Sequence, residues 1–212
     1  MKSKPVVIIG AGGHAKVLID ALLLMRVKVL GILDPDPLLT GTSLLGCRVL
    51  GNDELLADYP PGDVALVNAI GSVTLPRLRT DIFFRFRQQG FSFRSVIHSL
   101  SAVSQHAQCA EGVQVMAGAV IQAGAQIDEN VIVNTRASID HDCKISAHSH
   151  IAPGVTMSGG VLVGAGCHIG SGATLIQGVS VGEGAVVAAG AVVVCDIPPG
   201  AKAMGVPAKV VK

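Results

Sequence analysis

The chain has few aromatic residues, and those few are confined to its first half. One tyrosine and five phenylalanines lie between Tyr59 and Phe93, and there is no tryptophan. The segment that follows must therefore build its core without aromatic rings. This change in packing material predicts a boundary near residue 95 and two domains, residues 1–94 and 95–212, a number that a chain of 212 residues allows.

Strong net charge and long apolar runs are also absent. A net charge of +1 and a charged fraction of 15% exclude a basic surface for nucleic acid, so no nucleic-acid partner is expected. The apolar run at residues 6–9 is too short for a signal peptide. Charges such as Arg26 and Lys28 interrupt the other runs well before the roughly 20 residues that a membrane helix needs. We therefore expect a cytoplasmic protein that does not insert into membranes.

The cysteines form no recognisable pattern. The five of them are scattered at positions 47, 109, 143, 167 and 195, without a C-x-x-C pair. This spacing argues against a disulfide framework and against a cysteine-based zinc site. We expect packed thiols.

The C-terminal half does contain a repeat of six residues. From Ile97 to Val193, every sixth residue, seventeen positions in all, is Ile, Val, Leu, Met or Cys. The residue four places later is small or β-branched almost throughout, as at Ala119 and Ala137. This period fits a parallel β-helix in which three hexads form one triangular coil, and it fits neither a helix nor an alternating strand. The periodicity leaves the handedness open, and the general crossover rule favours a right-handed coil.

The N-terminal half has the pattern of a short Rossmann-like α/β domain. Residues 6–9, 27–33 and 64–70 are predicted strands, and residues 16–25 and 80–89 are predicted helices. Residues 10–15 match G-x-G-x-x-A, a turn whose N–H groups can hold phosphate oxygens or serve only as a tight turn. A domain of this size fits one mononucleotide better than a dinucleotide.

His141 differs from the other outward-facing histidines of the repeat in its surroundings. Residues one coil apart stack about 4.8 Å from each other, which places His141 between Ala123 and Gly159. Both neighbours are small, so the imidazole borders open space and the backbone N–H groups around Gly159 can approach a ligand. Asp142 follows directly and can fix the tautomer of the imidazole.

His150 lies half a coil after His141, so one solenoid cannot readily bring the two histidines together. Two solenoids side by side can place His141 of one copy and His150 of the next in one cleft. His168, one coil after His150, is either a structural partner or part of a cofactor groove. A zinc site made of His141, His148 and His150 lacks a matching ligand spacing, so no metal is expected.

Residues 10–17, the hexads, Asn134, the run 139–143 and His150 together resemble one branch of the hexapeptide-repeat acyltransferases, the NeuD/PglD type. That branch contains bacterial sialic acid O-acetyltransferases and N-acetyltransferases of UDP-4-amino-4,6-dideoxy sugars. Residues 205–209 also resemble the tail of the family. The resemblance covers nearly the whole chain and implies an N-terminal Rossmann-like domain, a left-handed parallel β-helix, a homotrimer and acetyl-CoA as co-substrate.

The resemblance also implies roles for individual residues. It makes His141 the general base and Asp142 its partner, and it makes Asn134 a substrate residue of the cleft. Besides the base, the residues expected to contact acetyl-CoA are His150, Gly159, Gly160 and His168. The expected contacts to the nucleotide of the substrate are Gly12, Gly13, His14, Asp34 and Gly71.

The expected function is transfer of acetyl from acetyl-CoA to the 4-amino group of a UDP-linked amino-dideoxy sugar, in the synthesis of bacterial surface glycans or glycoproteins. O-acetylation of sialic acid or another sugar is the first alternative. A nicotinamide-dependent enzyme and a non-catalytic scaffold are more remote ones. The sequence leaves open the sugar, the nucleotide base, the acceptor atom and the residues that hold the adenine and phosphates of CoA.

Overall fold

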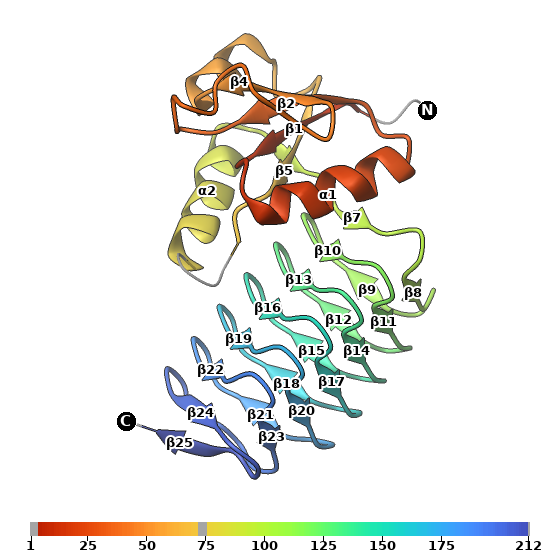
Figure 1. The fold of residues 1–212 in the computed structure, drawn as a ribbon. Helices are drawn as coiled ribbons and strands as arrows, with labels where there is room; N and C mark the ends of the chain where they lie inside the picture. The colour runs from red at the N-terminus through yellow and green to blue at the C-terminus, as the bar shows by residue number, and fades with distance from the viewer. Residues whose placement is uncertain (1–3, 72–75, 212) are drawn as a thin grey trace. The chain divides into compact units, whose positions relative to one another are not determined.

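The computed structural model describes residues 4–71 and 76–211. It divides into two compact units, Met1–Ser99 and Leu100–Lys212. The first unit is an α/β domain and the second is a left-handed parallel β-helix, the two fold classes that were predicted (Figure 1). Residues 95–99, which the sequence prediction assigned to the second domain, group with the first unit.

The first unit is built on a twisted sheet with the order β3-β4-β2-β1-β5-β6. All neighbours are parallel except the pair β3 and β4. Its elements in chain order are β1 (Val6–Ile9), α1 (Gly13–Leu24), β2 (Val29–Leu33), β3 (Ser43–Leu44), β4 (Cys47–Gly51), the 3-10 helix η1 (Asp53–Asp58), β5 (Ala65–Asn68), α2 (Pro76–Gln88), β6 (Ser92–Phe93) and β7 (Val96–Ile97).

The central strand β1 is buried along its whole length, as a parallel strand covered on both faces must be. Val7 and Ile9 of β1 pack in one core cluster with Phe83 and Phe86 of α2. With the exception of the exposed Phe84, the phenylalanines of the chain therefore belong to the core of the first unit. Helix α2 begins at Pro76, earlier than the predicted start at residue 80, because proline is well suited to the first helical position.

The second unit consists of three sheets whose strands succeed one another in turn around the coil (Figure 1). Their strands pair in parallel, except for the antiparallel pair of β24 and β25 near the C-terminus. The first sheet contains β10 (Gln114–Val115), β13 (Ile132–Val133), β16 (His150–Ile151), β19 (His168–Ile169), β22 (Val186–Val187), β24 (Lys202–Met204) and β25 (Lys209–Val211). The second contains β8 (Ala102–Val103), β11 (Val120–Ile121), β14 (Ser138–Ile139), β17 (Thr156–Met157), β20 (Thr174–Leu175) and β23 (Val192–Val193). The third contains β9 (Gln108–Cys109), β12 (Gln126–Ile127), β15 (Lys144–Ile145), β18 (Leu162–Val163) and β21 (Ser180–Val181).

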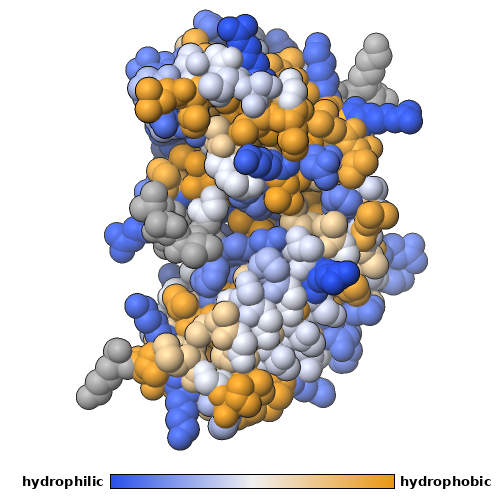
Figure 2. Space-filling model, in the orientation of Figure 1, coloured by the Kyte–Doolittle hydropathy of each residue, from blue (hydrophilic) through white to orange (hydrophobic). Residues whose placement is uncertain are grey.

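The six-residue repeat accounts for the core of the solenoid. Ile121, Ile139 and Met157 stack directly in the second sheet, each one coil after the last. They are buried, as are the small residues Ala119 and Ala137 at the fifth position of the hexad. On the face of the solenoid seen in Figure 2, many residues are of intermediate hydropathy, and apolar residues such as Met204, Val206 and Val210 are exposed near the C-terminal end of the chain. No helix in the described part of the chain is long and apolar enough to cross a membrane.

Candidate active site

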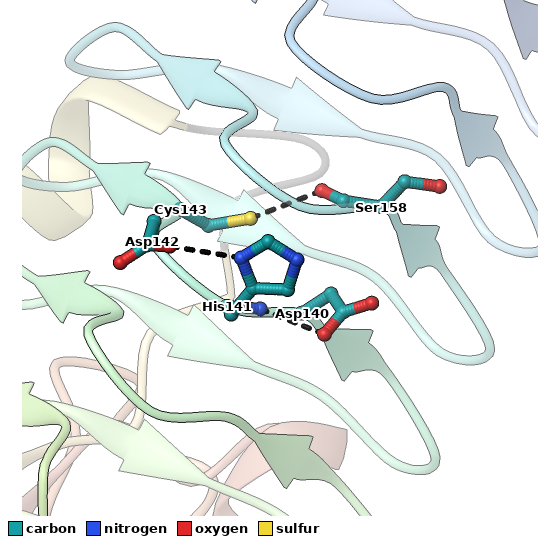
Figure 3. Close-up of polar contacts among 5 residues, drawn as sticks. All are labelled: Asp140, His141, Asp142, Cys143 and Ser158. Atoms are coloured by element: carbon teal, nitrogen blue, oxygen red, sulfur yellow. Dashed lines mark hydrogen bonds and ion pairs between the residues drawn. The ribbon is translucent and has the colours of Figure 1, made fainter.

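His141 lies in a corner of the solenoid between β14 and β15, flanked by Asp140 and Asp142 (Figure 3). Asp142 has a φ of 59°, in the left-handed region. The same corner one coil earlier and one coil later is occupied by Gly124 and Gly160, also with positive φ. An L residue adopts this conformation at some energetic cost, which Asp142 shares with Asn130, Arg136 and His148 at the equivalent corners of neighbouring hexads.

Both aspartates contact His141 (Figure 3). The imidazole Nδ1 donates to Oδ2 of Asp142 over 2.8 Å, and the backbone N–H of His141 donates to Oδ1 of Asp140 over 2.8 Å. With its proton on Nδ1, a neutral imidazole carries a lone pair on Nε2. No residue in the described part of the chain hydrogen-bonds Nε2, and 56% of the side-chain surface is exposed.

The pKa of His141 is raised above its usual value. The hydrogen bond to Asp142 is the main cause, the negative charge of Asp140 comes second, and desolvation opposes both. A histidine with a raised pKa is a stronger base once it is neutral. Its proton-accepting form is therefore lost as the pH falls through the raised pKa.

Gly159 lies directly against the imidazole from the next coil. A Cβ at this position would stand 2.5 Å from both Cε1 and Nε2 of His141. The neighbouring N–H groups are already bonded, Ser158 to Leu175 O at 3.0 Å and Gly160 to His141 O at 2.9 Å. Among the described residues, the N–H of Gly159 has no acceptor. Of the N–H groups of Ser158, Gly159 and Gly160, that of Gly159 is therefore the one available to a ligand.

Asn134 and His150, which the sequence assigned to different ligands, form a hydrogen bond. Nδ2 of Asn134 donates to Nε2 of His150 over 3.1 Å, while Oδ1 of Asn134 accepts the N–H of Thr135 at 2.8 Å. The ring of His168 stands edge-on to that of His150, with 5.1 Å between centroids. Burial lowers the pKa of His168. His150, at a position expected to face outward, is buried.

His148 is held by a separate contact. Nδ2 of Asn130, one coil earlier, donates to Nδ1 of His148 over 3.0 Å. Within residues 4–71 and 76–211, no three His, Cys, Asp or Glu side chains gather closely enough to hold a metal ion. The alternative of a zinc site at His141, His148 and His150 therefore has no cluster to support it.

The glycine-rich turn of the first unit leads into α1. Gly12 is the N-cap residue, so no side chain caps the N–H groups at the start of the helix. The first turn contains no acidic residue. There is open space beside the α-carbons of Gly12 and Gly13. His14 lies in the same first turn. Helix N-termini of this kind attract anions, because their N–H groups lack intrahelical acceptors.

Asp34, at the end of β2, is tied to this turn. Its carboxylate accepts the N–H of Ala11 at 2.7 Å and that of Asp36 at 3.0 Å. A cavity of about 390 Å³ opens beside it, at the carboxyl ends of β1, β2 and β5. The cavity is lined by Ile9, Gly10, Leu33, Asp34, Pro35, Asp53, Ile70, Leu78, Asp81, Ile82 and Arg85. Of the predicted nucleotide contacts, Asp34 lines this cavity, and Gly12, Gly13, His14 and Gly71 do not.

Sequence reasoning missed a buried arginine in the first unit. Arg79 of α2 is 1% exposed and donates to the carbonyls of Asn68 and Ile70, at 2.7 and 2.9 Å. Asn68 in turn donates to the carbonyl of Arg79 over 2.9 Å. Burial lowers the pKa of Arg79 to about 9. No spacing or motif distinguishes such an arginine from a surface one, so the sequence carries no signal for it.

Sequence reasoning also missed Asp140 and Gly124. Asp140 stands beside the predicted base, and its contact to the backbone of His141 depends on the fold of the corner. Gly124 precedes Asp142 by one coil, and a Cβ there would collide with Oδ1 of Asp142. A search one coil to either side of each predicted site residue would have found Gly124.

Known proteins share this architecture. Residues 5–83 match the family model of the PglD N-terminal domain. The acetyltransferase domain of PglB from Neisseria gonorrhoeae is 38% identical, with a TM-score of 0.91 over 99% of this chain and 100% of that one. Another of its structures is a complex with acetyl coenzyme A.

Perosamine N-acetyltransferase from Caulobacter crescentus is 41% identical, with a TM-score of 0.92 over 98% of this chain and 97% of that one. Its structures include a complex with CoA and GDP-perosamine in which one histidine is replaced by asparagine. WeeI from Acinetobacter baumannii, 23% identical with a TM-score of 0.87 over 99% of this chain and 100% of that one, shares the fold. The chain belongs to the family of PglD-type hexapeptide-repeat sugar acetyltransferases.

Proposed function

We propose that this chain transfers acetyl from acetyl-CoA to the 4-amino group of a nucleoside diphosphate-linked amino-dideoxy sugar. The observation that carries the proposal is the corner at His141. There, a histidine bonded through Nδ1 to a carboxylate leaves Nε2 open beside the unbonded N–H of Gly159. The relatives that bind CoA or acetyl-CoA support the choice of acyl donor.

In the proposed reaction, the sugar amine attacks the thioester carbonyl carbon while Nε2 of His141 accepts a proton from the amine. A carbon–nitrogen bond forms and the carbonyl oxygen becomes an oxyanion, which the N–H of Gly159 stabilises. The carbon–sulfur bond then breaks, and the imidazolium returns its proton to the departing CoA thiolate. Asp142 keeps the imidazole oriented throughout and stabilises its protonated form.

The other site residues keep the roles that the sequence suggested, as part of the proposal. His150, Gly159, Gly160 and His168 contact acetyl-CoA, and Asn134 is assigned to the sugar cleft. The bond from Asn134 to His150 adds a second task, because it fixes which nitrogen of His150 carries the proton. We propose a homotrimer in which the active site lies between neighbouring solenoids, and exposed apolar residues on the solenoid, Leu162, Ile176 and Val194, support such assembly.

The first unit is proposed to hold the nucleotide, with phosphates at the start of α1 and the base in the cavity beside Asp34. The sequence suggested a UDP sugar, and the Caulobacter relative binds GDP-perosamine. Of the three carboxylates in the lining, those of Asp34 and Asp53 are already bonded to backbone N–H groups and to Arg85, so the carboxylate of Asp81 is the one that favours guanine. Guanine presents two adjacent N–H donors that a carboxylate can accept together, whereas uracil presents a single donor between two acceptors.

The proposal is tested by following acetyl-CoA consumption with UDP-linked and GDP-linked 4-amino sugars and with sialic acid. We expect turnover with a nucleotide-linked amino sugar, an N-acetylated product, and competition by free GDP stronger than by UDP. Turnover with sialic acid alone would instead establish O-acetylation. Binding of NAD by calorimetry would support the nicotinamide alternative, and failure to bind CoA at millimolar concentration would support a scaffold. A cytoplasmic location, where acetyl-CoA is available, remains part of the proposal.

A further inference from the structure

The carboxylate of Asp142 lies against Gly124 of the preceding coil. One of its oxygens, Oδ2, accepts the hydrogen bond from His141. The other, Oδ1, occupies the space that a Cβ at Gly124 would need. A methyl group at Gly124 and the present position of the carboxylate are therefore mutually exclusive.

Gly159 of the following coil lies against the imidazole of His141. A Cβ at Gly159 would stand 2.5 Å from Cε1 and Nε2 of His141. The His141–Asp142 pair thus lies between Gly124 of the coil before and Gly159 of the coil after, with both side chains exposed. The space that the two glycines leave matters for the hydrogen bond between His141 and Asp142, because such a bond weakens steeply when its donor or acceptor is turned away from the optimal direction.

Asp140 holds the main chain at His141. Its Oδ1 accepts the N–H of His141 over 2.8 Å, which holds the peptide that carries the imidazole (Figure 3). Asp140 and Asp142 are also the two charged groups of the described residues that act on the imidazole, and both raise the pKa of His141. The facing residues of the adjacent coils, Ala123 and Gly159, are uncharged.

We propose that Gly124 and Asp140 are positioning residues of the acetyl transfer reaction. Gly124 keeps the space in which Asp142 meets His141, and Asp140 anchors the backbone of His141, so that Nε2 faces the substrate amine. Neither residue touches a reacting atom. The inference rests on the proposed function, in which His141 is the general base.

The chain offers a matched control for Gly124. Gly124 and Gly190 both occupy corners of the solenoid with left-handed backbone, at φ of +76° and +67°. A methyl group at Gly124 would strike Asp142, whereas a methyl group at Gly190 has no neighbour within 4 Å. Gly124→Ala and Gly190→Ala therefore share the backbone strain and differ in the contact with the carboxylate.

The experiment measures kcat, both KM values and the pH profile of kcat/KM for the two variants in the full chain. For Gly124→Ala we expect kcat to fall about 10-fold or more, a part of the full effect of a general base. Both KM values should stay near wild type. The acidic limb of the profile should move to lower pH, because the hydrogen bond that raises the pKa of His141 is weakened. Gly190→Ala should retain the wild-type kcat and profile.

Two further variants test the inference, and Asp140→Asn does so even if Gly124→Ala folds poorly. In an Asp142→Asn background, Gly124→Ala should lower kcat no further, because both changes act on one hydrogen bond. Asp140→Asn should also move the acidic limb to lower pH. Equal losses in Gly124→Ala and Gly190→Ala, an additional loss in the Asp142→Asn background, or an unmoved limb in Asp140→Asn would each overturn the inference. Undiminished turnover in His141→Ala would instead overturn the proposed function.

Discussion

At the scale of single residues, the chemistry of the candidate site depends on which nitrogen of the His141 ring is free to accept a proton. Asp142 occupies Nδ1, and the backbone N–H of His141 is held by Asp140. What remains is Nε2, exposed beside a glycine whose own N–H is unbonded. A proton acceptor and a hydrogen-bond donor thus lie next to each other, as acyl transfer to an amine requires.

Replacement of His141 by alanine should lower kcat by roughly 10²–10⁴-fold, the usual effect of removing a general base. The fold should persist, because the imidazole is more than half exposed and contributes little to the core. Steady-state kinetics with acetyl-CoA, together with thermal unfolding, measures both effects. His106→Ala is the control, since His106 is also an exposed histidine of the solenoid. A kcat for His141→Ala similar to that of His106→Ala would exclude His141 as the base.

At the scale of elements, the solenoid depends on residues that bring consecutive coils into close contact. Gly170 follows β19, and a Cβ on it would lie 2.5 Å from the backbone nitrogen of Ala189 in the next coil. Gly164 and Gly182 show the same approach to backbone atoms. Backbone atoms cannot rotate away from an added methyl group as a side chain can. The methyl group would therefore push apart the paired strands of adjacent coils.

Gly170→Ala should therefore destabilise the protein by roughly 1–3 kcal/mol, the usual cost of overpacking. The free energy of unfolding in urea, followed by circular dichroism, measures this cost. Gly62→Ala is the control, because there is open space beside the α-carbon of Gly62. It should change the free energy of unfolding by no more than about 0.5 kcal/mol. Equal stability of the two variants would contradict the close approach at Gly170.

At the scale of the whole molecule, one chain does not bring the proposed groups into a single site. His141 follows β14 of the second sheet, and His150 opens β16 of the first sheet. The two histidines thus project from different parts of the coil. In the proposed homotrimer, a neighbouring copy would complete the site, because each copy would present both parts and receive the complementary part from the next copy.

Mixing two inactive variants tests this arrangement. Chains with His141→Ala and chains with His150→Ala should each have little activity alone. After unfolding together in equal amounts and refolding, random trimers should recover about a quarter of wild-type activity, since each site takes one histidine from each of two neighbours. Light scattering gives the mass of the assembly. A mixture no more active than its components would place both histidines in the same chain's site, or outside catalysis.

The fold of the second unit was predictable because the hydrophobic pattern that specifies it repeats every six residues. Seventeen apolar positions in steps of six determine a core that no other regular structure would bury. The handedness required the family resemblance, since the periodicity is the same for either hand. The starts of helices were less predictable, as Pro76 of α2 shows, because the ends of helices depend on a few local groups.

The candidate site was predictable to the extent that it follows the coil spacing. Steps of one coil placed Gly159 beside His141 and His168 beside His150 before any coordinates, since parallel pairing in register leaves no other arrangement. The tertiary structure alone decided which donors and acceptors were already used. It bonded Asn134 to His150, tied Ser158 and Gly160 into the coil and left the N–H of Gly159 open. Hydrogen bonds depend on directions and distances of a few tenths of an ångström, and a sequence records only the order of residues.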